Sequence, residues 1–296
     1  MDVLSDAITA MRTGRPHSGI QRRRAPWSSA FPASDGAGFH VVLQGGCRFE
    51  PPGGPPVVLG VGDVLFLPRE PGHGLASTVD TGAETVMLCG SYQLDGARPH
   101  PLWTALPPYV HIPARIGDPT ALRAAIDLLG TELAADRPGA DAMIPAILDT
   151  MLICMLRHWI DTGSEPGGHG WAAAMRDPAI VKALTALHES PAGDWTVAAL
   201  AAAAGLSRSG FSQRFTEMIG RTPVAYLTWW RMTLAAKRLR ETDAPIAVVA
   251  REVGYTSEFA FAKAFKRELG VAPGAYRRPV PAASRIRPDS PARAVL

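Results

Sequence analysis

The chain has 296 residues, of which 47% are apolar, and its formal net charge is only +3. This length accommodates two domains, and the apolar content is ordinary for a soluble protein. No apolar run approaches the ~20 residues that span a bilayer, the N-terminus lacks the apolar core of a signal peptide, and three cysteines do not make a disulfide scaffold. We therefore expect a cytoplasmic protein with no membrane partner.

The charge is distributed unevenly along the chain. Residues 1–170 carry 12 Lys and Arg against 17 Asp and Glu, a net charge of −5. Residues 195–278 carry 13 Lys and Arg against 6 Asp and Glu, a net charge of +7. A basic module joined to an acidic domain is typical of a nucleic-acid-binding protein that has a separate sensor.

The N-terminal segment begins with a helical pattern. Residues 2–12 place their apolar side chains on one face and predict a short helix. We interpret Arg22–Arg24 as a solvated loop rather than a phosphate contact.

From residue 39 to residue 110 the pattern changes to short strands. The β-rich runs Phe39–Leu43, Pro56–Leu59 and Asp63–Leu67 are separated by turns rich in Gly and Pro. Many short strands with regular turns predict a β-barrel or a jelly roll.

The run GDVLFLPREPGH, residues 62–73, resembles the second motif of the cupin fold, with Glu70 in place of the usual glycine. The first cupin motif, a His-x-His, is poorly met because Val42 stands two residues after His40. A complete metal triad is therefore absent, and we expect no cofactor. His40 and His73 remain candidate metal ligands or effector contacts, and the alternative is that both are hydrogen-bonded barrel residues.

Two cysteines lie in the same segment. Cys47 and Cys89 are either small buried apolar residues or a thiol pair that senses oxidants, because accessible thiols of low pKa oxidise selectively. The sequence gives neither the exposure nor the pKa of these thiols, so both interpretations stay open.

Two longer helices are predicted next, at 119–135 and 142–159. The second carries a wide apolar stripe, more than a small barrel needs for packing. That stripe consists of Ile144, Ile147, Leu148, Met151, Leu152, Met155 and Trp159. Residues 161–170, rich in Gly, predict a linker, and the Pro- and Arg-rich residues 279–296 predict a disordered tail.

The C-terminal part contains the same two-helix unit twice. Short helices at 197–205 and 246–253 each end at a glycine, and a second helix follows, at 208–219 and at 259–269. Ser207 and Ser257, which are 50 residues apart, are the expected N-caps of the second helices. Two helices joined by a tight turn containing glycine form a helix-turn-helix. A helix from Pro223 to about Arg240 connects the units, and we expect it to fix their spacing.

These units resemble the DNA-binding domain of the AraC/XylS family of bacterial transcription regulators. The matching strings are LAAAAGLSRSGFSQRFTEMIGRTPVAYLTWWRMTLAAKRL and PIAVVAREVGYTSEFAFAKAFKRELGVAPGAYRR. The strings FHVVLQGGC and GDVLFLPREPGHGLAS resemble the cupin-like sensor domain of one subgroup of that family. The resemblance implies two DNA-reading helices in successive major grooves, roughly 34 Å apart, and dimerisation through the helices at 119–135 and 142–159. Packing of these two helices within their own domain is the alternative.

The resulting fold class is α+β, with an N-terminal cupin-like β-barrel carrying dimerisation helices and a C-terminal all-α domain of two helix-turn-helix units. We expect a sensor and dimerisation domain at 1–160, a linker at 161–176, a DNA-binding domain at 177–278 and a tail at 279–296.

The helical period separates core from DNA-facing positions in each second helix. Phe211, Phe215, Phe261 and Phe265 face inward. By position in the family motif, the side chains expected at the DNA are Arg208, Ser209, Ser212 and Gln213 in the first unit and Glu258, Phe259, Ala262 and Lys263 in the second. Gln pairs with adenine, Lys reads guanine, Glu accepts from cytosine and Phe contacts a thymine methyl. Phosphate contacts or surface charges are expected from Arg214, Lys266, Arg267 and Arg277.

The sequence thus predicts a non-enzymatic, dimeric activator that binds double-stranded DNA, contacts RNA polymerase and responds to a small effector or an oxidant. Two alternatives stay open. One is a cupin-type metalloenzyme fused to a helical module, and the other is a constitutive DNA-binding protein whose barrel only dimerises.

Overall fold

The computed structural model describes residues 2–34, 36–94, 100–114, 120–135, 137–163 and 170–277. It divides into two compact units, Met1–Ser190 with Trp195–Tyr226, and Pro191–Asp194 with Leu227–Leu296. Strands occupy the N-terminal part and helices the C-terminal part, so the predicted α+β class is confirmed. The tail predicted at 279–296 lies outside the described residues.

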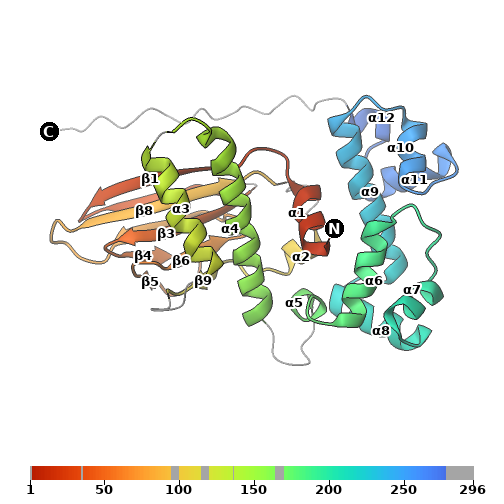
Figure 1. Ribbon diagram of the computed structural model, residues 1–296, viewed down its shortest axis with the longest axis horizontal. Helices are drawn as coiled ribbons and strands as arrows, with labels where there is room; N and C mark the ends of the chain where they lie inside the picture. The colour runs from red at the N-terminus through yellow and green to blue at the C-terminus, as the bar shows by residue number, and fades with distance from the viewer. Residues whose placement is uncertain are drawn as a thin grey trace. The chain divides into compact units, whose positions relative to one another are not determined.

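The strands of the first unit form two antiparallel sheets (Figure 1). The five-stranded sheet has the order β1-β8-β3-β6-β9, and the four-stranded sheet has the order β2-β7-β4-β5. The strands are β1 His17–Arg24, β2 Ser28–Phe31, β3 Ala37–Gln44, β4 Cys47–Glu50, β5 Val57–Leu59, β6 Val64–Leu67, β7 His73–Ser77, β8 Glu84–Tyr92 and β9 Val110–Ile112.

One apolar core joins the two sheets. Its fully buried members include Val42 and Met87 from the first sheet and Phe49 and Leu75 from the second. Side chains of opposite sheets therefore pack face to face, as in a β-sandwich of the jelly-roll type.

The interpretation of Arg22–Arg24 as a loop is wrong. These residues belong to β1, where Arg22 pairs with Val86 and Arg24 pairs with Glu84 of β8. The strand lacks the alternating buried positions that identify a strand from sequence, because every residue of His17–Arg24 is exposed or half-buried. Pairing with β8 supplies hydrogen bonds that the side-chain pattern does not indicate.

Helices α3, Ala121–Ala135, and α4, Ala140–Thr162, pack against each other beside the five-stranded sheet (Figure 1). The α4 stripe, predicted to form a dimer interface, is instead largely buried inside the chain, from Ile147 to Trp159. That part of the prediction is corrected, because α4 contacts β1 and β9 of the protein itself. Helix α4 is long and apolar enough to cross a membrane, but the buried core helix of a soluble protein can have the same length and composition.

Three shorter helices complete the N-terminal half and its junction with the C-terminal half. They are α1 Val3–Met11, α2 Pro101–Thr104 and α5 Trp171–Ala174. The side chain of Asp2 caps α1 by accepting from the backbone N–H groups of Leu4 and Ser5. Helix α5 stands within the segment expected to be a linker, and all four of its residues are buried.

The C-terminal helices follow the sequence prediction closely. They are α6 Pro178–Glu189, α7 Val197–Ala204, α8 Arg208–Ile219, α9 Pro223–Glu241, α10 Ile246–Glu252, α11 Glu258–Leu269 and α12 Pro273–Tyr276. Helix α9 is continuous, although its first turn belongs to the first compact unit and the rest to the second.

Candidate nucleic-acid interface and sensor site

The two expected reader helices, α8 and α11, are built in the same way. The Ser207 hydroxyl accepts from Gly210 N at 3.2 Å, and the Ser257 hydroxyl accepts from Ala260 N at 3.3 Å, so both predicted N-caps are confirmed. Gly220 and Gly270 end the helices at φ +74° and +78°, a left-handed conformation that suits glycine. Each reader is therefore fixed at both ends by its own local sequence.

Each reader is held by aromatic side chains on one face. Phe211 and Phe215 of α8 are fully buried, with ring centroids 5.4 Å apart, and Phe261 and Phe265 of α11 repeat the arrangement at 5.5 Å. This anchoring leaves the opposite face of each helix to solvent. The predicted separation of core and outward positions is confirmed.

The outward faces carry the side chains that are predicted to contact DNA. Arg208, Ser209, Gln213, Glu258, Phe259, Lys263, Lys266 and Arg267 are exposed, and Ser212 and Ala262 are half-buried. Phe259 is 80% exposed, an unusual position for a large apolar side chain. Gln213 donates to Glu217 at 2.9 Å, so it must exchange this partner to pair with a base.

Two of the side chains predicted to be phosphate contacts or surface charges have hydrogen-bond partners within the chain. Arg214 donates from Nε to the Asp177 carboxylate at 2.6 Å, and Asp177 also caps α6. Arg277 donates to the carbonyl oxygen of Ala244. Neither guanidinium is a simple surface charge, because each one binds another segment of the chain.

The sensor candidates His40, His73 and Cys89 come together inside the sandwich. His40 lies in β3 opposite Cys89 of β8, whereas His73 begins β7 in the other sheet. His40 Nε2 is 2.9 Å from His73 Nε2, and His40 Nδ1 is 3.1 Å from Cys89 Sγ. Burial lowers the pKa of His40 to about 3, helped by the neighbouring His73, and burial also lowers the pKa of His73.

Because both imidazoles are neutral, the contacts of His73 set the direction of each hydrogen bond. His73 Nδ1 faces the Pro71 carbonyl oxygen at 2.8 Å, and a carbonyl only accepts, so Nδ1 carries the proton. His73 Nε2 therefore accepts from His40 Nε2. His40 Nδ1 is then the unprotonated nitrogen and accepts from the Cys89 thiol. The cluster is a chain in which a thiol donates to a histidine base.

The second predicted thiol has a different environment. Cys47 lies in β4, is fully buried and belongs to the apolar core. Burial, with a smaller contribution from Asp63, raises the pKa of Cys47 to about 12. Burial also raises the pKa of Cys89 to about 12, and the proximity of Cys47 contributes to that shift. Both thiols are therefore protonated at neutral pH in this conformation.

The donor set does not fit a metal centre built on three protein ligands. The Cys89 sulfur contacts His40 on the ring nitrogen that faces away from His73, so the three side chains do not converge on one point. Among the described residues, no group of three or more His, Cys, Asp and Glu side chains is placed to hold a metal ion.

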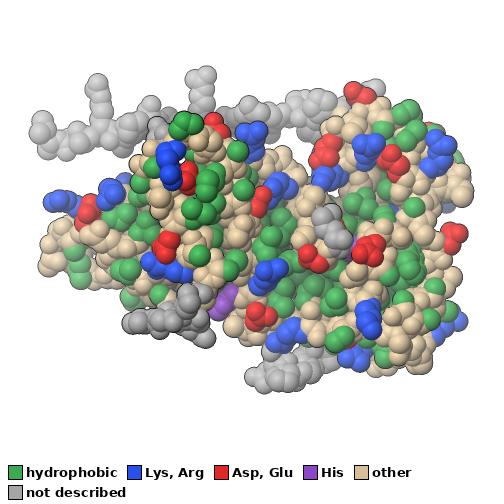
Figure 2. Space-filling model, in the orientation of Figure 1, with side chains coloured by type: hydrophobic (Ala, Val, Ile, Leu, Met, Phe, Trp, Pro, Cys, Tyr) green, Lys and Arg blue, Asp and Glu red, His purple; other side chains and the backbone are tan. Residues whose placement is uncertain are grey.

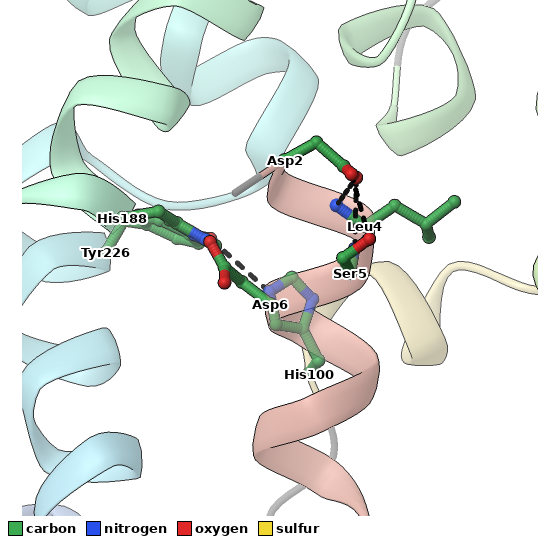
Figure 3. A network of polar contacts seen from close by, with 7 residues as sticks. All are labelled: Asp2, Leu4, Ser5, Asp6, His100, His188 and Tyr226. Carbon is green, nitrogen blue, oxygen red and sulfur yellow. Dashed lines mark hydrogen bonds and ion pairs between the residues drawn. The ribbon is translucent and has the colours of Figure 1, made fainter.

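One largely buried polar cluster has no counterpart among the sequence predictions. The side chains of Asp6, His100, His188 and Tyr226 form a connected chain of contacts (Figure 3). No local motif indicates it, because its members come from four separate segments between Asp6 and Tyr226.

Comparisons with known proteins agree with both halves of the chain. A family model described as Cupin matches residues 2–161, and one described as Helix-turn-helix domain matches residues 200–279. A putative AraC-like transcription regulator of Streptomyces antibioticus is 33% identical, over 95% of this chain and 100% of its own length. The RCS-specific HTH-type transcriptional activator RclR of Escherichia coli K12 is 34% identical, over 82% of this chain and 84% of its own.

A solved structure is similar to about a third of the chain. The DNA-binding domain of AdpA, in complex with a target DNA, is 33% identical, covers 34% of this chain and 90% of its own, and has a TM-score of 0.33.

Proposed function

Because the chain belongs to the AraC-like transcription regulators, we propose that it activates transcription by binding a specific double-stranded DNA site as a homodimer and contacting RNA polymerase. The observation that carries this proposal is the pair of capped helices, α8 and α11, with buried Phe pairs on one face and exposed polar side chains on the other. We place the sensor domain at 1–160 and the DNA-binding domain at 177–278, in a non-enzymatic cytoplasmic protein.

The second reader supplies most of the base recognition in this proposal. Lys263 reads guanine, Glu258 accepts from cytosine, and the exposed ring of Phe259 contacts a thymine methyl. The first reader offers Ser209, Ser212 and Gln213, shorter side chains that make fewer direct contacts. Arg208, Lys266 and Arg267 bind phosphates and fix the register of the protein on DNA.

The homodimer is proposed to form through the helical layer of the first unit. With most of the α4 stripe buried, the apolar side chains that remain exposed there include Leu128 of α3 and Met143 of α4. Figure 2 shows a green patch where Figure 1 places α3. Apolar side chains on a surface helix favour association with a second copy.

The signal is proposed to act at the chain formed by Cys89, His40 and His73. The Cys89 thiol beside the His40 base is a group that an oxidant can attack, and a relative that is 34% identical carries the name RCS-specific HTH-type transcriptional activator. With hydrogen peroxide as the oxidant, the Cys89 proton passes to His40 and the sulfur takes one oxygen as the O–O bond breaks. The departing hydroxide takes the proton from His40, so the products are sulfenic acid and water.

The protonated state of the thiol sets a condition on this reaction. A thiol whose pKa is about 12, as at Cys89, reacts slowly, so the sandwich must admit water or the oxidant before the sulfur becomes nucleophilic. A small effector that enters the sandwich at the same cluster is the second candidate signal, and it needs no change in the thiol.

The test is binding of the purified protein to sheared genomic DNA, with and without hydrogen peroxide. We expect a discrete enriched site with two half-motifs about one helical turn apart. Oxidant sensing is supported if the enrichment depends on the oxidant, if Cys89→Ser removes that dependence and if the control Cys154→Ser keeps it. The variant Cys47→Ser then shows whether the second thiol takes part. Enrichment that is the same with and without hydrogen peroxide favours a small effector as the signal. Absence of any specific DNA site under both conditions contradicts the proposal that the chain is a transcription regulator.

A further inference from the structure

The loop that joins α6 to α7, Pro191–Asp194, belongs to the second compact unit, although both of these helices belong to the first. Helix α7 packs against α6 and against the reader α8. The Trp195 side chain donates from Nε1 to the Ser190 carbonyl oxygen at 2.8 Å, which ties the two ends of the loop together. The loop is therefore a short, closed connection attached to the first helix-turn-helix.

The side chain of Arg231, on α9, holds this loop. Its Nε donates to the Pro191 carbonyl oxygen at 2.6 Å, and its Nη2 donates to the Gly193 carbonyl oxygen at 2.8 Å. A guanidinium presents its donors in a fixed planar fork, so one side chain can bind two carbonyl groups of the same loop. Hydrogen bonds from a charged donor are also stronger than those between neutral groups.

The same guanidinium contacts the turn of the second helix-turn-helix. The Cζ atom of Arg231 lies 5.8 Å from the centre of the Tyr255 ring, within the range of a cation–π interaction. The Tyr255 ring packs edge-on against Phe261, with ring centroids 5.7 Å apart. Phe261 is one of the two buried rings that anchor the reader α11. Arg231 therefore binds both the loop and the support of α11.

Gly254, which begins this turn, shows how closely the loop approaches it. Gly254 has a φ of +82°, in the left-handed region. A Cβ atom at this position would lie 2.8 Å from the Cα and from the carbonyl oxygen of Ala192, and 2.9 Å from Arg231 Nη2. The loop backbone, the turn and the guanidinium are therefore in direct contact, with no room for a side chain between them.

The loop is a second connection between the two reader helices. The continuous helix α9 is the first connection, because the chain passes from one compact unit to the other within it. A helix of this length fixes a distance along its axis but still bends. A second connection, held at the end of a side chain that projects from the axis, opposes that bending.

We propose that Arg231 is a spacing-determining residue: by holding the loop 191–194 against the turn at Gly254 and Tyr255, it fixes the separation of the two DNA half-motifs that the protein accepts. This inference rests on the proposed function as a DNA-binding regulator. Two linked readers strengthen each other only where the geometry lets both bind at the same time. A looser pair gains less affinity at the correct spacing and discriminates less against other spacings.

The test uses the full chain and the DNA site that the wild-type protein selects. Affinity is measured for that site, for the site with one base pair added or removed between the half-motifs, and for a single half-motif. Arg231→Lys keeps the positive charge, and with it the general attraction to phosphate, but loses the planar fork. The matched control is Arg238→Lys, because Arg238 also lies on α9 but pairs with Glu252 of α10, with Nε 3.1 Å from Oε2.

A second variant loosens the loop and leaves Arg231 in place. Two glycines inserted between Ala192 and Gly193 lengthen an exposed part of the loop, and added loop residues cost little stability. The control carries the same insertion between Gly53 and Gly54, in the exposed turn between β4 and β5.

We expect Arg231→Lys and the loop insertion each to weaken binding to the selected site about tenfold, because part of the gain from linking two readers is lost. Binding to a single half-motif should stay unchanged, so the preference for the native spacing falls by a similar factor. The combined variant should bind no more weakly than the weaker of the two, since both changes release the same loop. Both controls should bind as the wild type does.

An unchanged spacing preference in either variant overturns the proposal, and if Arg231→Lys does not fold, the loop insertion alone decides. Equal weakening on the full site and on the single half-motif also overturns it, because that result means damage to one reader. If the wild type selects no DNA site, the spacing role fails together with the proposed function. A wild type that selects a site, with variants that keep its spacing preference, removes the spacing role alone.

Discussion

The buried His40 makes a quantitative prediction about stability against pH. Replacing it by Gln keeps one donor and one acceptor in the cluster but removes the titrating group. The pKa of His40 is about 3 in the folded chain and about 6.5 when unfolded. Below pH 6.5 the unfolded state therefore binds a proton that the folded state does not, and stability falls as the pH falls toward 3.

The magnitude follows from these two pKa values. Between pH 7.5 and pH 5.0 the linkage predicts a loss of about 2 kcal/mol in the free energy of unfolding from His40 alone. His73 and His100, whose pKa values are also lowered by burial, add to the loss in the wild type. The His40→Gln variant should therefore lose about 2 kcal/mol less than the wild type over the same range.

The assay is urea unfolding at pH 7.5, 6.0 and 5.0, followed by tryptophan fluorescence and by circular dichroism. His17→Gln is the control, because His17 lies exposed on β1. Parallel pH profiles for the wild type and His40→Gln would refute the reasoning, since they would mean that His40 takes up its proton as easily in the folded state as in the unfolded state.

Three further predictions concern the DNA-binding domain. Lys263→Ala should weaken binding by about 1–3 kcal/mol and relax one base preference, measured by selection from random DNA; an equal loss on every sequence would assign Lys263 to a phosphate instead. Ser257→Ala should lower stability by about 1 kcal/mol in thermal unfolding, because Ala260 N loses its cap, whereas the exposed Ser209→Ala should leave the melting temperature unchanged. Arg214→Ala should lower stability by about 1–2 kcal/mol in urea unfolding, because the buried Asp177 carboxylate loses its cation, and an unchanged midpoint would contradict this.

The helical half of the fold could be predicted from the sequence because its signals are local. Ser207, Ser257 and the glycines that follow each reader define helix ends within a few residues of chain, and the Phe pairs four residues apart define the buried face. The exposed strand β1 could not be predicted in this way, since its residues have no alternating burial and its partner strand β8 begins only at Glu84.

The apolar stripe of α4 was predicted correctly, but the surface predicted to cover it was wrong. An apolar face predicts burial, but the pattern does not say whether the protein's own sheet or a second copy covers it. The positions of β1 and β9 decided this, because they lie against α4 in the same chain.

The sequence by itself determined the two capped reader helices, their outward side chains and the pair of histidines worth testing, because each of these depends on spacing along the chain. Only the tertiary structure decided which groups meet. The register of β3 on β8 places Cys89 beside His40, and the packing of the two sheets brings His73 to the same ring. The contact between Asp6 of α1 and His188 of α6 depends likewise on helix packing, because the two residues are 182 positions apart in the chain. Such contacts are fixed by burial of apolar faces from distant segments, which no local pattern records.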